Sequence, residues 1–186
     1  TAQRMSQGEL LQLERSHDYW MEEEIYYRLI GDKTASLISA ACQLGAVSSQ
    51  ASEQEIAAMA KFGENVGLAF QIRDDLLDLL GVEKTTGKPI GNDLRENKIT
   101  LPLLHALKQA EKRQAKRIIR LMKKGLGKND IKKIVDFIQE NGGVAYATQK
   151  ANALTKEALC ELDRYPDSKY KQVLTRLVEF ITTREH

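Results

Sequence analysis

Apolar residues recur every three to four positions along nearly the whole chain, while the alternation with a period of two that marks strands is absent. Only three prolines interrupt this pattern. The spacing therefore predicts an all-α fold. With 186 residues and 42% hydrophobic content, we expect the chain to form one helical domain over residues 1–186.

Glycines and capping residues divide the pattern into segments. Ser52 followed by Glu55 is a capping box, which predicts the start of a long helix that ends before Gly81. Ser6 with Glu9 predicts an earlier start, and Thr100 is placed to cap a helix that begins at Leu101. The expected helices are 6–30, 33–44, 52–80, one that begins at 101, 110–124, 129–141, 143–164 and 168–183. We expect a break near 16–18 in the first helix and an end before Gly45 in the second. Residues 82–99 are expected to form a loop.

Carboxylates form a stripe on the 52–80 helix. Gln71, Asp74, Asp75 and Asp78 follow i, i+3, i+4, i+7 spacing and so share one face, while the rest of the circumference is mainly apolar. A helix apolar nearly all round is a buried helix. Three acids buried together cannot stay ionised without a cation, which favours a divalent metal over the alternative of a solvated face.

The ligand types indicate which metal. Oxygen ligands without a histidine or cysteine cluster favour Mg²⁺, which keeps several waters and shares its ligands with substrate phosphates. Lys33 lies at a helix start, and Lys88 and Lys98 follow the acids in the loop. Each alone is a surface lysine, but beside an acid stripe they could reach phosphate oxygens. The sequence therefore predicts a metal-bridged phosphate or diphosphate site.

Composition excludes several classes of protein. The net charge of +2 gives no overall field for nucleic acid or an anionic membrane. The basic segment Glu111–Lys124 has no interleaved aromatics, so we expect it to be a solvated face, with nucleic-acid binding as the weaker alternative. No apolar run is long enough to span a bilayer. Cys42 and Cys160 lack metal or disulfide spacing, which predicts reduced cysteines and a cytoplasmic protein.

Four segments over residues 8–104 resemble the trans-isoprenyl (polyprenyl) diphosphate synthase family. Residues 67–78, GLAFQIRDDLLD, resemble its second aspartate-rich motif. The segment after that motif is similar at 86–89, 92–94 and 97–104, the Lys-Thr element at Lys33-Thr34-Ala35, and the Gly-Glu element at 8–12. The order of the four elements also matches, and the pattern looks closer to long-chain synthases than to farnesyl enzymes.

The resemblance implies an all-α bundle around a central cavity, usually a homodimer. It implies Mg²⁺-dependent condensation of isopentenyl diphosphate with an allylic diphosphate. By this match Asp74 and Asp78 would ligate Mg²⁺ and Asp75 would assist directly or through water; Lys33, Lys88 and Lys98 would bind the diphosphate; Thr34 and Gln71 would face the allylic cation. Because the product would be a lipid, peripheral membrane contact is also expected.

The family's first aspartate-rich motif has no match in this chain. The other acidic run, Glu22–Glu24, lacks flanking arginines and an apolar setting. We therefore expect the N-terminal helices to be missing, the chain to be a C-terminal portion, and its isolated activity to be absent. A truncated synthase, a heteromeric synthase with the N-terminal part on another chain, and a non-catalytic diphosphate-binding subunit remain open, as does a related terpene-forming enzyme.

Product length depends on the cavity wall. Small or polar residues leave space, and Ser36, Ser39, Ala40 and Gln43 are our candidates for lining a deep tunnel.

Overall fold

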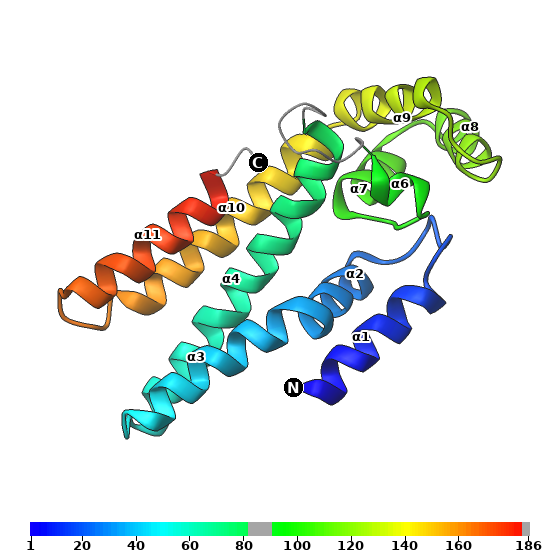
Figure 1. The fold of residues 1–186 in the computed structure, drawn as a ribbon. Coiled ribbons are helices and arrows are strands. Elements are labelled where there is room, and N and C mark those ends of the chain that lie inside the picture. Colours follow the sequence, from blue (N-terminus) through cyan, green and yellow to red (C-terminus); the bar gives the residue numbers. More distant parts are fainter. Residues whose placement is uncertain (82–90, 184–186) are drawn as a thin grey trace.

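The computed structural model describes residues 1–81 and 91–183, without the side chains of residues 128, 182 and 183 (Figure 1). Every regular element in these ranges is helical, which confirms the all-α prediction. The helices are α1 (Ala2–Glu14), α2 (Glu23–Ile30), the π-helical turn η1 (Gly31–Ala35), α3 (Ser36–Ser48), α4 (Glu53–Leu80), α6 (Asn92–Arg95), α7 (Leu101–Gln109), α8 (Lys112–Met122), α9 (Lys128–Glu140), α10 (Gly143–Leu162) and α11 (Lys169–Thr183).

The long helix α4 begins at the predicted capping box. The Glu55 amide donates to Ser52 Oγ, and the Ser52 amide donates to Glu55 Oε2 at 2.8 Å. These two bonds satisfy donors that the first turn of a helix otherwise leaves unpaired. The helix ends at Leu80, with Gly81 as its C-cap, as the pattern predicted.

The predicted helix 6–30 is two helices. The break near residues 16–18 is confirmed, and His17 there has a φ of 69°, which ends right-handed helix geometry. The predicted start at Ser6 is wrong, because α1 begins at Ala2 with Thr1 as its N-cap.

Two glycines expected to end helices do not. Gly31 has φ −61° and ψ −51°, ordinary helical values, so the chain continues from α2 through η1 into α3. Gly45 lies inside α3, which runs on to Ser48. Glycine lowers helix propensity by only about 1 kcal/mol, and at the buried Gly31 packing against α4 offsets that cost.

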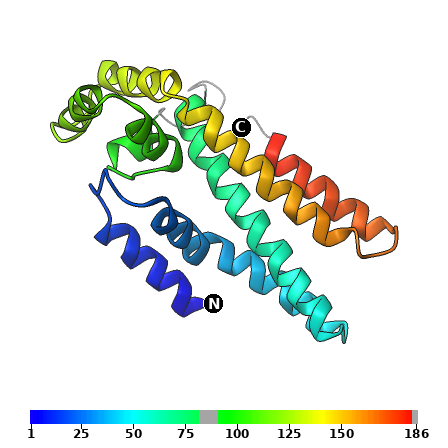
Figure 2. The same ribbon diagram turned by 180° about the vertical axis from the view of Figure 1, so that it is seen from behind.

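Helix α4 is the centre of the fold. It lies beside α10 along much of its length and crosses α3 on another side (Figures 1 and 2). The two helices α3 and α4 cross so closely that a Cβ on Gly63 would lie 2.7 Å from Ser39 Cα, a distance that real Cβ atoms do not reach. Small residues therefore let the two backbones approach.

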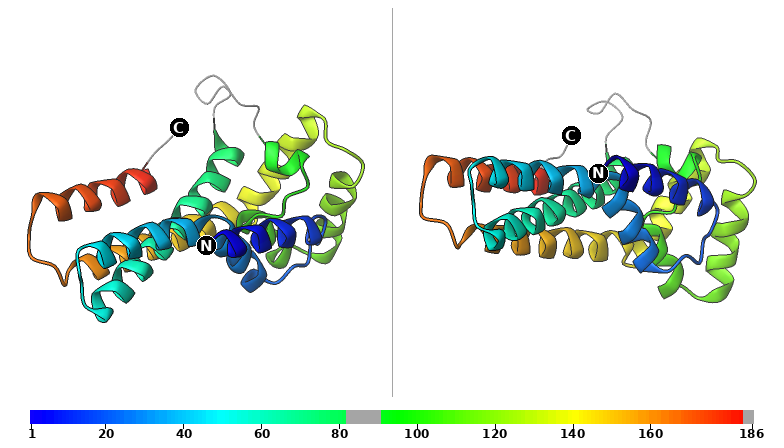
Figure 3. Two further views of the ribbon diagram at one scale, coloured as in Figure 1. Left: turned by 60° about the horizontal axis from the view of Figure 1, so that its bottom comes forward. Right: turned by 90° about the horizontal axis from the view of Figure 1, so that it is seen from below.

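The apolar core has two parts. One cluster joins α2, the end of α4, α7, α8, α9 and α10, and includes Tyr26, Ile72 and Leu103. The other joins α4, α10 and α11 around Phe62 and Val178. Figure 3 shows the resulting elongated molecule, with α8 and α9 at one end and the connection between α10 and α11 at the other. No helix in the described parts is both long and apolar enough to cross a membrane.

Candidate functional site

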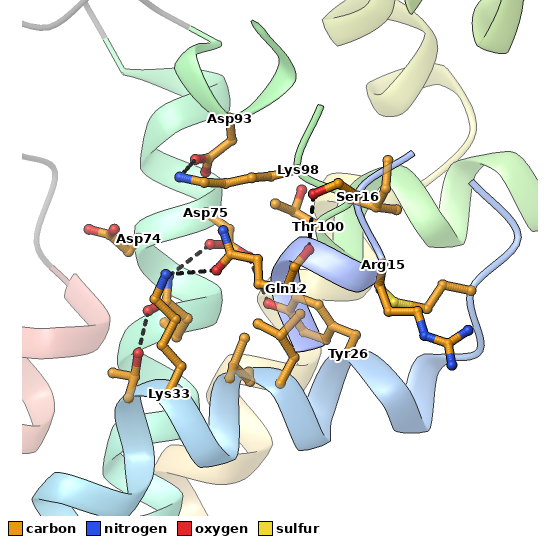
Figure 4. Close-up of a pocket in the computed structure, with 16 residues that line it drawn as sticks. Gln12, Arg15, Ser16, Tyr26, Lys33, Asp74, Asp75, Asp93, Lys98 and Thr100 are labelled. Atoms are coloured by element: carbon orange, nitrogen blue, oxygen red, sulfur yellow. Dashed lines mark hydrogen bonds and ion pairs between the residues drawn. The ribbon is translucent and has the colours of Figure 1, made fainter. Parts of the chain in front are cut away.

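Gln71, Asp74 and Asp75 of the predicted acid stripe line a pocket of about 120 Å³ (Figure 4), whereas Asp78 does not line it. The pocket lies between α1, the α2–η1 segment, α4 and the segment that follows α6. Its walls combine acids, lysines, amides and apolar side chains. The lining residues are Gln12, Arg15, Ser16, Met21, Tyr26, Leu29, Ile30, Lys33, Thr34, Gln71, Asp74, Asp75, Asp93, Lys98, Ile99 and Thr100.

Asp75 is the buried acid of this pocket, with 5% of its surface exposed. Its Oδ2 accepts a 2.7 Å hydrogen bond from the Tyr26 hydroxyl, and its Oδ1 accepts a 3.0 Å bond from Gln71 Nε2. Burial raises the pKa of Asp75 to about 7, and the two hydrogen bonds lower it only in part. A cation beside this carboxylate would therefore relieve a real electrostatic cost.

The hydrogen bonds extend from Asp75 to η1. Thr34 Oγ1 donates to Gln71 Oε1 at 2.9 Å, so Thr34, Gln71, Asp75 and Tyr26 form one chain of hydrogen bonds. Thr34 and Gln71 were predicted as site residues from separate segments, and the structure brings them together. Because each amide and hydroxyl in the chain is held by its neighbour, the pocket wall is preorganised.

A glycine contact sets the distance between η1 and α4. A Cβ on Gly67 would lie 2.4 Å from Ala35 Cα, so only glycine allows the two backbones this approach. Ala35 follows Thr34 directly, and Gly67 lies one helical turn before Gln71. The contact therefore holds Thr34 within reach of Gln71.

Lys33 reaches the pocket beside this contact. Its Nζ lies 2.7 Å from Glu9 Oε2 and donates to Gln12 Oε1 at 2.7 Å. Both partners come from α1. This helix lies so close to η1 that a Cβ on Gly8 would be 2.6 Å from the backbone nitrogen of Lys33, so only glycine fits there. Helix α1 therefore holds the ammonium group in position while leaving it about one-third exposed.

Lys98 approaches from the opposite side. Its Nζ lies 3.1 Å from Asp93 Oδ1 and 2.7 Å from Glu96 Oε2. Burial lowers the pKa of the ammonium group, but the bonds with Glu96 and Asp93 outweigh burial and raise it, so Lys98 stays charged. In the view of Figure 4, Lys98 lies above Asp75 and Lys33 below it. Lys88, the third predicted lysine, lies outside the described residues.

The expectation that all three acids of the stripe are buried is wrong. Asp74 is exposed at the pocket edge, and only Asp75 is fully buried. Asp78 lies one turn further, where its Oδ1 and Oδ2 accept 3.1 Å bonds from the amides of Asn92 and Asp93. Asp78 therefore caps the first turn of α6 and ties it to α4, and burial raises its pKa to about 6.

The described residues do not by themselves form a closed metal cage. Within residues 1–81 and 91–183, no three histidine, cysteine, aspartate or glutamate side chains are grouped so as to hold a metal ion. A metal bound to the carboxylates of this pocket would therefore need ligands in addition to these described side chains.

Several residues of the pocket were not among those predicted from the sequence. One is Tyr26, whose hydroxyl donates to Asp75, and burial raises the pKa of that hydroxyl well above its usual value. The helical spacing could have identified Tyr26 as a site residue. Tyr26 lies seven residues before Lys33 and eight before Thr34, which places all three on one helix face. Gln12 lies one turn after Gly8 and Glu9 in the same way.

The proposed tunnel residues on α3 do not line this pocket. Ser36 is buried and donates to the Asp32 carbonyl, and Ser39 donates to the Ala60 carbonyl of α4. Gln43 is exposed. At Ser39 the small side chain serves close helix packing.

Ionisation of Asp75 predicts a pH dependence of stability. The folded-state pKa of about 7 lies above the ordinary value of 3.8, so the folded state binds the extra proton. The stabilising effect is complete below pH 4 and is lost as the pH rises through 7. In chelator-treated protein, the wild type should lose on the order of 2 kcal/mol relative to Asp75→Asn between pH 5 and pH 8.

Urea denaturation of both proteins at the two pH values measures this difference, and comparison with the variant removes the contribution of other acids. A constant difference between the two proteins would contradict the assignment of a raised pKa to Asp75. Asp78 is present in both proteins, so its own titration cancels.

Comparison with known proteins identifies relatives of this arrangement. The sequence model of the polyprenyl synthetase family matches residues 1–138. The short chain isoprenyl diphosphate synthase of Methanothermobacter thermautotrophicus is 34% identical over 98% of this chain and 56% of that protein. The chain thus spans little more than half the length of this curated relative.

Solved structures show the same fold. The polyprenyl synthase of Caulobacter crescentus, complexed with calcium and isoprenyl diphosphate, is 34% identical with a TM-score of 0.92, covering 99% of this chain and 56% of that one. The geranylgeranyl pyrophosphate synthase of Corynebacterium glutamicum, complexed with isoprenyl diphosphate and magnesium, is 30% identical with a TM-score of 0.86, covering 97% and 52%. The family match over residues 1–138, together with this fold and pocket, shows that the chain belongs to the polyprenyl synthetase family.

Proposed function

We propose that this chain forms part of a Mg²⁺-dependent trans-prenyltransferase that condenses isopentenyl diphosphate with an allylic diphosphate to make a polyprenyl diphosphate. The observation that carries the proposal is the pocket itself. Asp74 and Asp75 lie on α4, Lys33 and Lys98 reach the same pocket from two other segments, and Thr34 and Gln71 lie between them. Acids and lysines around one small pocket suit a metal-bridged diphosphate.

The donor set fits a hard divalent cation. Asp74 supplies carboxylate oxygens at the pocket edge, and Asp75 is a buried carboxylate with a raised pKa. We propose Asp74 and Asp78 as ligands of Mg²⁺, with Asp75 assisting directly or through water; each carboxylate oxygen of Asp78 retains a further lone pair beside its bond to α6. When bound, Mg²⁺ would neutralise negative charge on the departing diphosphate. The solved structures from Caulobacter crescentus and Corynebacterium glutamicum are complexes with calcium and with magnesium, respectively, which supports a divalent cation in the proposal.

The lysines bind the diphosphate in this proposal. Lys33 is held by Glu9 and Gln12, and Lys98 by Asp93 and Glu96, so both cations are positioned before ligand arrives. A diphosphate between them would accept charge-assisted hydrogen bonds. Lys88 is proposed as a third contact from the sequence resemblance alone.

Thr34 and Gln71 orient the allylic group. Both side chains line the pocket, Thr34 from η1 and Gln71 from α4, and the hydrogen bond between them fixes both. Oxygen dipoles directed at an allylic carbon stabilise positive charge as its bond to the diphosphate breaks. The apolar residues Met21, Leu29 and Ile30 in the same wall limit the access of water to that carbon.

We propose that this chain supplies one of the two acidic motifs of the whole enzyme. Residues 67–78 would be the second aspartate-rich motif, and the chain would be the C-terminal portion of a synthase. Activity would then require a first acidic motif from elsewhere, and the isolated chain would bind substrate without elongating it. We infer one domain over residues 1–186 and a cytoplasmic homodimer, with exposed leucines such as Leu10, Leu13 and Leu44 available for covering contacts.

Ligand binding tests the proposal. With Mg²⁺ and farnesyl diphosphate at about 100 times the dissociation constant, binding should stabilise the chain by about 2.7 kcal/mol. Its Tm should then rise by about 5–10 °C. Farnesol, which lacks the diphosphate, and a chelator with farnesyl diphosphate should each leave Tm unchanged.

If the Tm of the chain did not change on addition of Mg²⁺ and farnesyl diphosphate, this result would contradict the proposal. Labelled isopentenyl diphosphate, added with farnesyl diphosphate and Mg²⁺, separates the remaining possibilities. Hydrocarbon product would indicate a terpene-forming enzyme, and vigorous chain elongation by the isolated chain would refute the dependence on a second acidic motif.

A further inference from the structure

The strongest charged surface of the molecule lies on α8, at the end opposite the α10–α11 connection (Figure 3). Residues 111–124 contain seven lysines and arginines and one acid, Glu111, whereas the whole chain carries only +2. The rest of the chain is therefore net acidic. The cations are Lys112, Arg113, Lys116, Arg117, Arg120, Lys123 and Lys124, and all are exposed. We call these seven residues the α8 basic surface.

The α8 basic surface is a consequence of how α8 packs. Its apolar face, Ala115, Ile118, Ile119 and Met122, is buried against the core. The opposite face is left to the cations. Because the apolar face is already used, α8 has no hydrophobic side available for insertion, and any partner must be recognised through charge.

The cations of this surface are not neutralised within the described residues. No ion pair or hydrogen bond there joins a side chain of the α8 basic surface to an acid, and Lys123 Nζ lies 5.8 Å from the centre of the Tyr19 ring. Several basic residues elsewhere in the fold, among them Lys33, Lys61 and Lys98, do lie against a carboxylate. The cations of the α8 basic surface are therefore available to bind an anionic partner.

The shape of the surface favours a broad contact. A groove of about 550 Å³ runs between α8 and α9, with Arg117, Arg120, Lys124 and Lys133 on its sides. Asp136 and Glu140 also line it, and these acids disfavour the deep binding of a single phosphate. The outer cations, by contrast, extend along the whole of α8 with no acid beyond Glu111 among them.

We propose that the α8 basic surface docks this protein on an anionic lipid membrane. Cations spread over one helix suit a continuous layer of anionic headgroups, where each lysine or arginine near the surface contributes about 1 kcal/mol. Nucleic acid is disfavoured, because α8 presents no aromatic side chain on which bases could stack. The docking does not depend on the proposed catalysis, although a lipid product would make a membrane location useful.

Vesicle sedimentation tests the docking. The chain, at low salt, should bind vesicles of phosphatidylcholine with about 30% phosphatidylglycerol at least about tenfold better than pure phosphatidylcholine vesicles. Binding should fall about tenfold or more between about 0.05 and 0.5 M salt, because headgroup charges are screened. The proposal would be overturned if the chain bound both kinds of vesicle equally, or if its binding to the anionic vesicles were the same at low and high salt.

Matched variants assign the effect to α8. The triple variant Lys116→Gln, Arg117→Gln, Arg120→Gln should bind anionic vesicles about tenfold or more weakly. The control Lys156→Gln, Lys169→Gln, Arg176→Gln removes the same charge from exposed positions on α10 and α11 and should bind within about twofold of wild type. Equal loss in both would show a net-charge effect and overturn the assignment, as would tighter binding of wild type to duplex DNA than to the vesicles. Far-ultraviolet circular dichroism confirms that each variant folds.

Discussion

Replacing Asp74 with asparagine should abolish the stabilisation of this chain by Mg²⁺ and diphosphate. Asp74 is exposed at the pocket edge, beside the buried Asp75 and between Lys33 and Lys98. An amide oxygen carries no charge and binds a hard cation poorly. Loss of one direct ligand should weaken binding by about 100-fold or more, exceeding the usual effect of outer partners.

Thermal denaturation with Mg²⁺ and farnesyl diphosphate measures this effect. The Tm increase of the wild type should disappear, while the ligand-free Tm changes little, because the substituted side chain is exposed. Asp163→Asn is the matched control, because Asp163 is an exposed aspartate at the C-cap of α10, a helix that contributes no residue to the pocket. A ligand-induced shift in Asp74→Asn equal to that of Asp163→Asn would eliminate Asp74 as a ligand.

Gly67→Ala should both destabilise the chain and weaken diphosphate binding. The added Cβ would meet the backbone of Ala35 at 2.4 Å, and a backbone atom cannot rotate away. Helices η1 and α4 must separate, at a cost of about 1–3 kcal/mol. Separation lengthens the bond between Thr34 and Gln71, so both wall residues lose their fixed positions.

Gly45→Ala is the matched control for this substitution. Nothing lies within 4 Å of the Cβ that it would add in the middle of α3. Because alanine favours helices over glycine, this variant should gain about 0.5–1 kcal/mol. Urea denaturation and farnesyl diphosphate titration compare the two, and if Gly67→Ala proved as stable and as tightly binding as Gly45→Ala, the close contact would have no importance.

The helix assignments show which signals are reliable. The capping box at Ser52 and Glu55 located the start of α4, because its two hydrogen bonds involve only neighbouring residues. Gly31 and Gly45 were misjudged as ends, because one glycine costs a helix only about 1 kcal/mol, and at the buried Gly31 packing against α4 offsets that cost.

The candidate site was predicted more completely by family motifs than by periodicity. Periodicity placed Gln71, Asp74, Asp75 and Asp78 on one face, but it could not tell that only Asp75 is buried. The burial of each acid depends on what covers α4 at that level. Tyr26 covers Asp75, while Asp78 is turned to the amides of α6.

The sequence alone determined the all-α class and the long helix that carries Gln71, Asp74 and Asp75 on one face, because helical period and capping are local properties. Only the tertiary structure decided which acid is buried, which partners hold Lys33 and Lys98, and that Tyr26 belongs to the site. Those features arise where segments far apart in the chain approach closely, as at Gly8, Gly67 and Ala35. Such distances depend on the packing of the whole molecule, and no local pattern encodes them.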